Sequence, residues 1–197
     1  LMVFTLMLAR CRNLSLEQGR EVARTLDEIP AKVSQYLQNP GPIAAAVERI
    51  AAARYVLFLG RGFSYPVALE GALKLKEIAY IPCEGYPAGE MKHGPIAMLE
   101  KGTPVVVIVP RDSHTDKAIS NMMEVKARGA FLIVIHTKGD DEVQELADVS
   151  IPVPATADYA SPLVTVLPLQ LLAYHAGLAL GRDIDKPRNL AKSVTVE

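Results

Sequence analysis

Four short runs of apolar residues constrain the fold of this chain more than any other feature. They are "RYVLFLG", "PVVVIVP", "FLIVIH" and "VSIPVP", and "AYIPCEGY" makes a fifth, weaker run. Segments of helix length separate these runs along the chain. Continuously apolar strands that alternate with helices are typical of a parallel sheet covered by helices on both faces. The sequence therefore predicts an α/β fold, a doubly wound five-stranded parallel sheet of flavodoxin-like size.

The segments around the strands predict where the main helices lie. Residues 15–38 form an amphipathic pattern, with Ser15 as the expected N-cap, and Pro30 is expected to break this pattern into two helices. The residues "NPGP" at 39–42 disfavour any regular element and mark a domain boundary. The apolar stretch 162–181 predicts a mostly buried helix that closes the domain.

The opening residues "LMVFTLMLAR" raise the question of a targeting segment. No basic residue precedes the apolar run and Arg10 follows it at once, so it fits a signal peptide poorly, and it is too short to span a membrane. We interpret it as the end of a buried helix that belongs to a longer chain. The chain is thus expected to divide into a helical segment and linker (1–40), the α/β domain (41–186) and a carboxyl-terminal tail (187–197).

The bulk composition excludes some classes of function. Of the 197 residues, 50% are apolar and 22% are charged, which is ordinary for a globular protein. A net charge of −1, with no basic stripe that contains aromatic residues, argues against a nucleic-acid partner. Cys11 and Cys83 share no metal or redox spacing, which favours two reduced thiols in a cytoplasmic protein. No two histidines have metal-ligand spacing, so no metal is predicted.

The glycine turn after the first predicted strand is the first candidate for a ligand site. Gly60 and Gly62 permit close approach of the backbone, and Ser64 is expected to cap the next helix and to expose its N–H groups to an anion. The spacing matches neither the dinucleotide fingerprint nor the phosphate loop with its lysine, so no nucleotide cofactor is expected. Glycine turns at strand ends are also common for structural reasons alone.

The helix that follows this turn has a charged stripe. At about 100° per residue, Glu70, Lys74 and Glu77 lie within roughly 60° of one another on one face. One interpretation is a solvated stripe in which Glu70 and Lys74 form a favourable i,i+4 pair, and the other is an acid–base site beside a cleft. The opposite face is expected to meet the sheet through Tyr65, Ala68, Ala72 and Leu75.

Two further side chains could take part in chemistry. His93, in "EGYPAGEMKHGP", lies in a segment bounded by glycine and proline, where an imidazole is placed either for proton transfer or simply on the surface. Lys192, in "DKPRNLAKSVTVE", could attack a carbonyl if its pKa is lowered, or could be an ordinary tail lysine, and Arg188 stands about one helical turn before it. Carboxylate, imidazole, amine and glycine turn together fit proton transfer next to a carbonyl.

Three segments carry a family resemblance: "LGRGFSYPVALEGALKLKEIAY", "EGYPAGEMKHGPIAM" and "LPLQLLAYHAGLALGRDIDKPRNLAKSVTVE". They closely resemble the carboxyl-terminal half of the isomerising glutamine–fructose-6-phosphate aminotransferases, also called glucosamine-6-phosphate synthases. The resemblance spans about Tyr55 to Glu197, and "PRNLAKSVTVE" is its most specific part. It implies that residues 41–186 are the second of two sugar-isomerase (SIS) domains, and that residues 1–40 are the last helix of the first domain and the connector to the second.

The resemblance also implies catalytic roles. Glu77 matches the general base that moves the proton between C1 and C2 of the sugar, and Lys74 matches a neighbour that supports this base electrostatically. His93 matches the histidine that opens the sugar ring, which the family lends across a dimer interface to the partner's site. Lys192 matches the lysine that forms a Schiff base with fructose 6-phosphate. The tail would then be specific in sequence because it forms a wall of the active site.

The remaining implications concern ligands and partners. Glu70, Arg188 and Ala191 are expected to contact the substrate, and Arg188 lies beside the route by which ammonia arrives. Fructose 6-phosphate and glucosamine 6-phosphate are the expected substrate and product. The ammonia derives from glutamine in a glutaminase domain that this sequence lacks. No cofactor is expected, and the chain is expected to form a homodimer in the cytoplasm, with no nucleic-acid or membrane partner.

Two alternatives stay open on the residues alone. One is a regulatory SIS module that binds a sugar phosphate at the glycine turn without catalysis. The other is a related deglycase or deaminase with two SIS domains, which the ending "PRNLAKSVTVE" disfavours. Because the glutaminase domain and the first SIS domain are missing, the 197-residue chain alone is expected not to make glucosamine 6-phosphate from glutamine.

Overall fold

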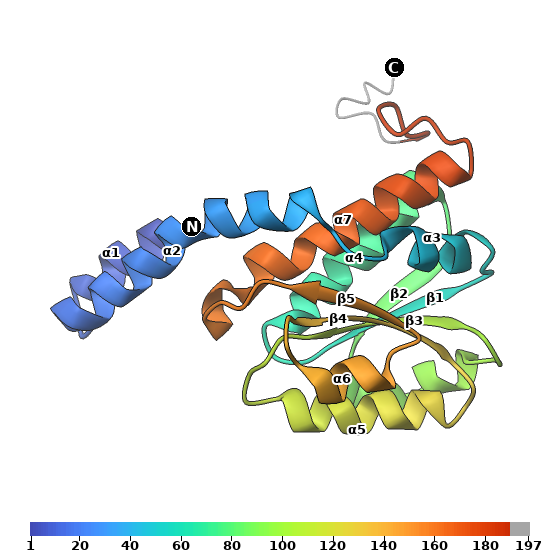
Figure 1. Cartoon of the computed structure of the whole chain (residues 1–197), viewed down its shortest axis with the longest axis horizontal. Helices are drawn as coiled ribbons and strands as arrows, with labels where there is room; N and C mark the ends of the chain where they lie inside the picture. The colour runs from blue at the N-terminus through green and yellow to red at the C-terminus, as the bar shows by residue number, and fades with distance from the viewer. Residues whose placement is uncertain (190–197) are drawn as a thin grey trace, which may run out of the picture.

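A computed structural model describes residues 1–189 and contains one five-stranded sheet (Figure 1). The strand order is β2-β1-β3-β4-β5 and every neighbouring pair is parallel, which confirms the predicted doubly wound α/β fold. Each strand coincides with one of the five apolar runs. The strands are β1 (Val56–Gly60), β2 (Cys83–Pro87), β3 (Pro104–Val109), β4 (Phe131–Thr137) and β5 (Val149–Val153).

Helices cover both faces of the sheet, with α3, α4 and α7 on one face and α5 and α6 on the other (Figure 1). Alternate strand residues point to opposite faces, so Phe58 joins the core beneath α4 and α7, whereas Leu57 and Leu59 join the core beneath α5. The helices are α1 (Met2–Arg10), α2 (Leu16–Gln38), α3 (Ile43–Ala51), α4 (Ser64–Ala79), α5 (Thr115–Lys126), α6 (Asp141–Leu146) and α7 (Ser161–Ala179), and the short 3₁₀ helices are η1 (Ala88–His93), η2 (Pro95–Met98) and η3 (Asp158–Ala160).

The amino-terminal helix α2 corrects one prediction. Ser15 is its N-cap as expected, in a capping box with Gln18, but Pro30 does not break it into two helices. Proline removes one backbone hydrogen bond and crowds the preceding turn, at a cost of about 3 kcal/mol, and a capped helix of 23 residues can absorb that cost by bending. The ribbon of α2 changes direction along its length in Figure 1.

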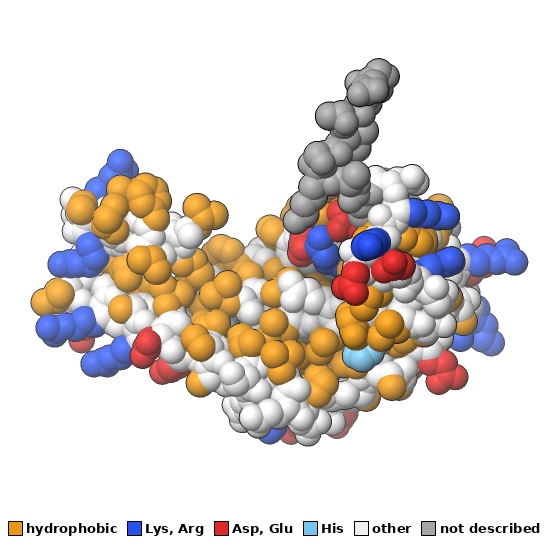
Figure 2. Space-filling model, turned by 90° about the horizontal axis from the view of Figure 1, so that it is seen from above, with side chains coloured by type: hydrophobic (Ala, Val, Ile, Leu, Met, Phe, Trp, Pro, Cys, Tyr) orange, Lys and Arg blue, Asp and Glu red, His pale blue; other side chains and the backbone are white. Residues whose placement is uncertain are grey.

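Helix α1 leaves its apolar side chains uncovered. The predicted helix is present, but none of its residues is buried by contacts within this chain, so the burial expected of it is not observed here. Figure 2, seen from above, shows hydrophobic side chains spread over this side of the molecule. The exposed large apolar side chains of α1, α4 and α7 include Val3, Phe4, Met7, Leu69, Leu73, Tyr174 and Leu178.

Helix α7 is the closing helix expected at 162–181. With the preceding turn it is, among the described residues, the one helix whose length and composition would allow it to cross a membrane (Asp158–Ala179). Here it packs on α4, α3 and the sheet, and its buried side chains, such as Val164, Leu169 and Leu172, belong to the core. These contacts are those of the core helix of an α/β domain.

A buried histidine in β4 makes the stability of the fold depend on pH. His136 is fully buried; its Nδ1–H donates to the Thr137 carbonyl oxygen at 3.0 Å, and its Nε2 accepts from the Ser150 hydroxyl at 2.7 Å. The carbonyl can only accept, so this pairing fixes the neutral Nδ1–H tautomer. Burial lowers the pKa of His136 below the usual value of 6.5, against smaller opposing effects of Thr137 and Asp140.

Acidification is therefore expected to destabilise the fold through this residue. Below pH 6.5 His136 binds a proton in the unfolded chain but stays neutral in the folded chain. The free energy of unfolding therefore falls by up to about 1.4 kcal/mol for each pH unit. Urea titrations between pH 7.5 and 5 should show a shallower pH dependence for His136→Gln than for the wild type. His175→Gln, which changes an exposed histidine, is the control. An equal slope in all three proteins would contradict the assignment.

Candidate active site

Ligands in open α/β sheets bind beyond the carboxyl ends of the strands, at the point where the strand order reverses. In this sheet that point lies between β1 and β3, where the Gly60–Ser64 turn faces the loop 110–115. The cavity there is only about 10 Å³, roughly the space of one water molecule. The turn and the loop 110–115 therefore pack closely against each other at this point.

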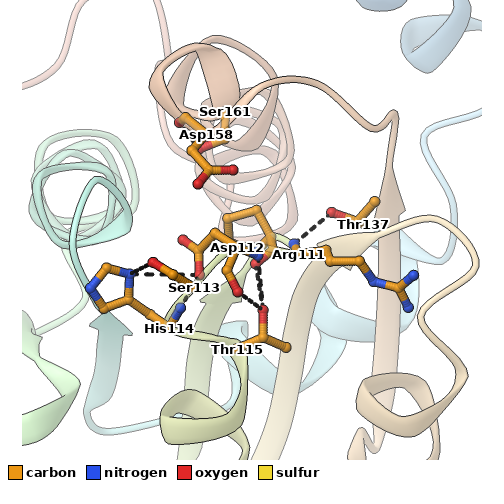
Figure 3. A network of polar contacts seen from close by, with 9 residues as sticks. Arg111, Asp112, Ser113, His114, Thr115, Thr137, Asp158 and Ser161 are labelled. Atoms are coloured by element: carbon orange, nitrogen blue, oxygen red, sulfur yellow. Dashed lines mark hydrogen bonds and ion pairs between the residues drawn. The ribbon is translucent and has the colours of Figure 1, made fainter.

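The loop after β3 fills this position with its own polar side chains (Figure 3). The Asp112 carboxylate accepts the backbone N–H of His114 at 2.7 Å, and the His114 ring lies against Gly62, where a Cβ would come within 3.1 Å of Cε1. The Ser113 hydroxyl lies 3.3 Å from His114 Nδ1, and the Thr115 hydroxyl donates to the Asp112 carbonyl oxygen at 2.9 Å. The sequence signal for this network is the "DSHT" run, since such side chains bond to nearby backbone.

The glycine turn itself corrects the prediction for Ser64. Phe63 occupies the N-cap position of α4, and Ser64 is the first helical residue, with its hydroxyl buried and without a hydrogen-bond partner among the described residues. The turn is close enough to require glycine at position 60, because a Cβ there would overlap the Ser64 carbonyl oxygen. Arg61, which could have met an anion here, donates instead to the Asn121 side chain at 2.9 Å.

The charged stripe of α4 assembles as predicted from helical spacing. The Lys74 ammonium lies 2.7 Å from the Glu77 carboxylate and 3.8 Å from that of Glu70. On the opposite face three of the four expected side chains are buried, namely Ala68, Ala72 and Leu75, whereas Tyr65 is only half-buried. The amphipathic pattern thus fixes which way Glu77 points.

Lys74 is a permanent cation in this stripe. Its hydrogen bond to Glu77 is the main cause that raises the pKa of Lys74 above its ordinary value; burial opposes this effect, and the charges of Glu77 and Glu70 add to it. About a third of the Lys74 side chain is exposed, so the pair adds little to stability. Its consequence is geometric, because the ammonium fixes the orientation of the Glu77 carboxylate.

The start of the tail meets Glu77 at a common cavity. A cavity of about 260 Å³ is lined by Lys76, Glu77, Tyr80, Arg188 and Asn189. The backbone N–H of Arg188 donates to the Tyr80 hydroxyl at 2.8 Å, and its guanidinium lies 4.3 Å from the centre of the Tyr80 ring. Two predicted site residues far apart in sequence, Glu77 and Arg188, are therefore brought to one place. Tyr80 was not predicted as a site residue.

His93 lies elsewhere. It ends η1, its side chain is 76% exposed, and its Nε2 lies 3.6 Å from the Glu90 carboxylate. It is not among the described residues that line the cavity beside Glu77. Its expected role in a partner's site stays a prediction. Ala191 and Lys192 lie outside the described residues, and so do the predictions made for them.

The two cysteines take no part in this region. Both are free; Cys11 is exposed, whereas Cys83 is buried at the start of β2, with its Sγ 3.0 Å from the Ala72 carbonyl oxygen. Burial raises the pKa of the Cys83 thiol to about 11, so it is not a thiolate at neutral pH. Cys83 therefore behaves as a small core residue.

Comparisons with known proteins agree with the fold. The SIS domain family matches residues 49–180. A relative in Bacteroides thetaiotaomicron, a "glutamine–fructose-6-phosphate aminotransferase [isomerizing]", is 49% identical over 198 residues, which cover all of this chain and 32% of that protein. The chain thus spans about a third of the length of the curated relatives it matches.

Two solved structures show the same architecture. The carboxyl-terminal domain of glucosamine–fructose-6-phosphate aminotransferase from Francisella tularensis superposes with a TM-score of 0.87 at 41% identity, over 93% of this chain and 52% of that one. Glucosamine-6-phosphate deaminase from Thermotoga maritima superposes with a TM-score of 0.65 at 22% identity, over 98% of this chain and 55% of that one. At that identity the second likeness concerns the fold alone.

Proposed function

Because this chain belongs to the SIS domain family, we propose that it is the carboxyl-terminal isomerase domain of an isomerising glutamine–fructose-6-phosphate aminotransferase. Its substrate is fructose 6-phosphate and its product is glucosamine 6-phosphate. The identity of 49% across the whole chain to the Bacteroides thetaiotaomicron relative supports this assignment. Ammonia comes from glutamine in a glutaminase domain outside this sequence.

One observation carries the catalytic part of the proposal: Lys74 holds the Glu77 carboxylate at a cavity that the start of the tail also lines. Lys192 follows Arg188 by four residues, and a chain of four residues spans at most about 14 Å. That separation is short enough for a lysine amine to reach a sugar bound beside Glu77. A base and an amine would then act on neighbouring carbons of one substrate.

The proposed reaction proceeds in three steps. His93, from a partner subunit, assists proton transfer that opens the sugar ring. The Lys192 amine adds to the C2 ketone and water leaves, which forms an imine, and ammonia then displaces the lysine to give the C2 imine of the sugar. Glu77 finally removes a proton from C1, which gives an enamine with the imine nitrogen protonated, and a proton is returned to C2 while the C1 hydroxyl loses its own proton, so that the nitrogen becomes the amine and C1 becomes the aldehyde carbon.

The subunit arrangement follows from the same assignment. The exposed position of His93, away from the cavity beside Glu77, supports a homodimer in which each chain lends this residue to the other. We place the protein in the cytoplasm, with no nucleic-acid or membrane partner, on the basis of its near-neutral charge and its two free thiols.

The regulatory alternative has less support. A module that only binds a sugar phosphate needs an anion site at the glycine turn, and the cavity there is about 10 Å³. The Ser64 hydroxyl and Arg61 are turned to the protein interior and to Asn121 instead. The deaminase alternative is supported only by a likeness of fold at 22% identity.

A chimera tests the proposal directly. When this chain replaces the matching 198-residue region of the Bacteroides thetaiotaomicron relative, the hybrid is expected to form glucosamine 6-phosphate from fructose 6-phosphate and glutamine. The 197-residue chain alone is expected to form none, because these residues match only about a third of the length of the relatives. Product is measured by coupled assay or mass spectrometry. A folded hybrid that hydrolyses glutamine and leaves fructose 6-phosphate unchanged would refute the assignment, and product from the isolated chain would refute the requirement for the missing domains.

A further inference from the structure

Two backbone conformations of the same unusual kind meet at the cavity beside Glu77. Tyr80 has φ 60° and ψ 27°, and Asn189 has φ 63°; within residues 1–189 they are the non-glycine residues with positive φ. Both line this cavity. The left-handed region is unfavourable for a residue as bulky as tyrosine, and helix ends in this conformation normally carry glycine or asparagine. Such a conformation persists only where surrounding contacts fix it.

The contacts that fix Tyr80 come from the segment after α7. Its hydroxyl accepts the backbone N–H of Arg188 at 2.8 Å. The guanidinium carbons of Arg188 and Arg182 lie 4.3 Å and 5.3 Å from the centre of its ring, within the range of cation–π attraction. One side chain thus contacts the segment through a hydrogen bond and through two charged groups.

The same residue is tied to the candidate general base. Tyr80 follows directly after α4, three residues beyond Glu77, so a shift of its ring would move the tail relative to Glu77. Because Arg188 is attached at its backbone N–H, the attachment fixes the path of the main chain and not only one flexible side chain.

We propose that Tyr80 is a positioning residue, which anchors the carboxyl-terminal segment at Arg188 beside Glu77 and so sets the point from which the tail enters the active site. This inference rests on the proposed function only in assigning the tail a catalytic lysine. The anchor itself is a contact between described residues and has a readout of its own.

The test uses Tyr80→Ala and Tyr80→Phe in the chimera, with Tyr174→Ala as the control that removes an exposed tyrosine from α7. Hydrogen exchange of a peptide that covers residues 186–189 should be faster in Tyr80→Ala, and the kcat for glucosamine 6-phosphate should fall ~10–10²-fold, as expected when a reacting group is misplaced. Borohydride trapping of fructose 6-phosphate at Lys192 should fall in parallel. Tyr80→Phe keeps the ring and should lie between Tyr80→Ala and the wild type in all three measurements.

The outcomes separate the anchor from the function. Unchanged exchange of 186–189 in Tyr80→Ala overturns the anchor, and faster exchange with an unchanged kcat overturns the positioning role. If the wild-type chimera forms no adduct and no product, the proposed function fails, while the exchange result still decides whether Tyr80 holds the segment. Tyr80→Phe shows whether an effect of Tyr80→Ala is due to misfolding, because phenylalanine keeps the bulk of the ring. Its thermal midpoint is expected to match that of Tyr174→Ala.

Discussion

Replacing Glu77 with glutamine in the chimera is expected to lower glucosamine 6-phosphate formation by ~10²–10⁴-fold, the usual contribution of a positioned acid–base group. Glutamine is close in size to glutamate and can still accept a hydrogen bond from Lys74, but it cannot take a proton from C1. Glutamine hydrolysis should continue at the wild-type rate, because it takes place in another domain.

The measurement compares product formation with glutamate release in the same sample. Glu48→Gln on α3 is a matched control, since it removes an exposed carboxylate from the same face of the sheet, outside the cavity beside Glu77. The control is expected to lose less than twofold in either activity. If Glu77→Gln forms product at the wild-type rate, Glu77 is not the base. The charged stripe of α4 would then be a solvated surface feature without a catalytic role.

The second large effect concerns Lys192. In Lys192→Arg the positive charge remains, but the guanidinium does not condense with a ketone, so borohydride should trap no fructose 6-phosphate at this position. Product formation from glutamine should fall by at least ~10²-fold, because a covalent step is lost.

Mass spectrometry of the tail peptide after reduction locates the adduct. Lys186→Arg, which changes an exposed lysine of the same segment, is the control and should retain both adduct and product. An adduct on a different lysine, or wild-type synthesis by Lys192→Arg, would remove Lys192 from the mechanism. Loss of the adduct with retention of synthesis would show that the imine with lysine is not on the reaction path.

The sheet could be predicted because its three central strands, β1, β3 and β4, are buried on both faces. Such strands appear in the sequence as short, continuous apolar runs, and the two weaker runs form the edge strands β2 and β5. The stripe of Glu70, Lys74 and Glu77 followed from the helical period alone, since residues three and four apart share a face. These features depend on neighbours along the chain, which a sequence pattern records.

What could not be predicted depends on contacts between distant segments. Tyr80 meets Arg188 across more than a hundred residues, and its left-handed backbone contradicts local preference, so no window of sequence around either residue indicates the pair. The expectation for Pro30 failed because the neighbouring helical turns outweigh the loss of one hydrogen bond. The expectation for Ser64 failed because the turn at Gly60 ends one residue earlier than the motif suggested.

The filled position between β1 and β3 separates two properties that often share one loop. If a sugar binds beside Glu77, groups other than the Gly60–Ser64 turn would bind its phosphate, because the His114 ring and the loop 110–115 pack against that turn. Affinity and turnover would then be encoded on different pieces of the polypeptide. Evolution could retune how strongly such an enzyme holds its substrate without disturbing the groups that transform it.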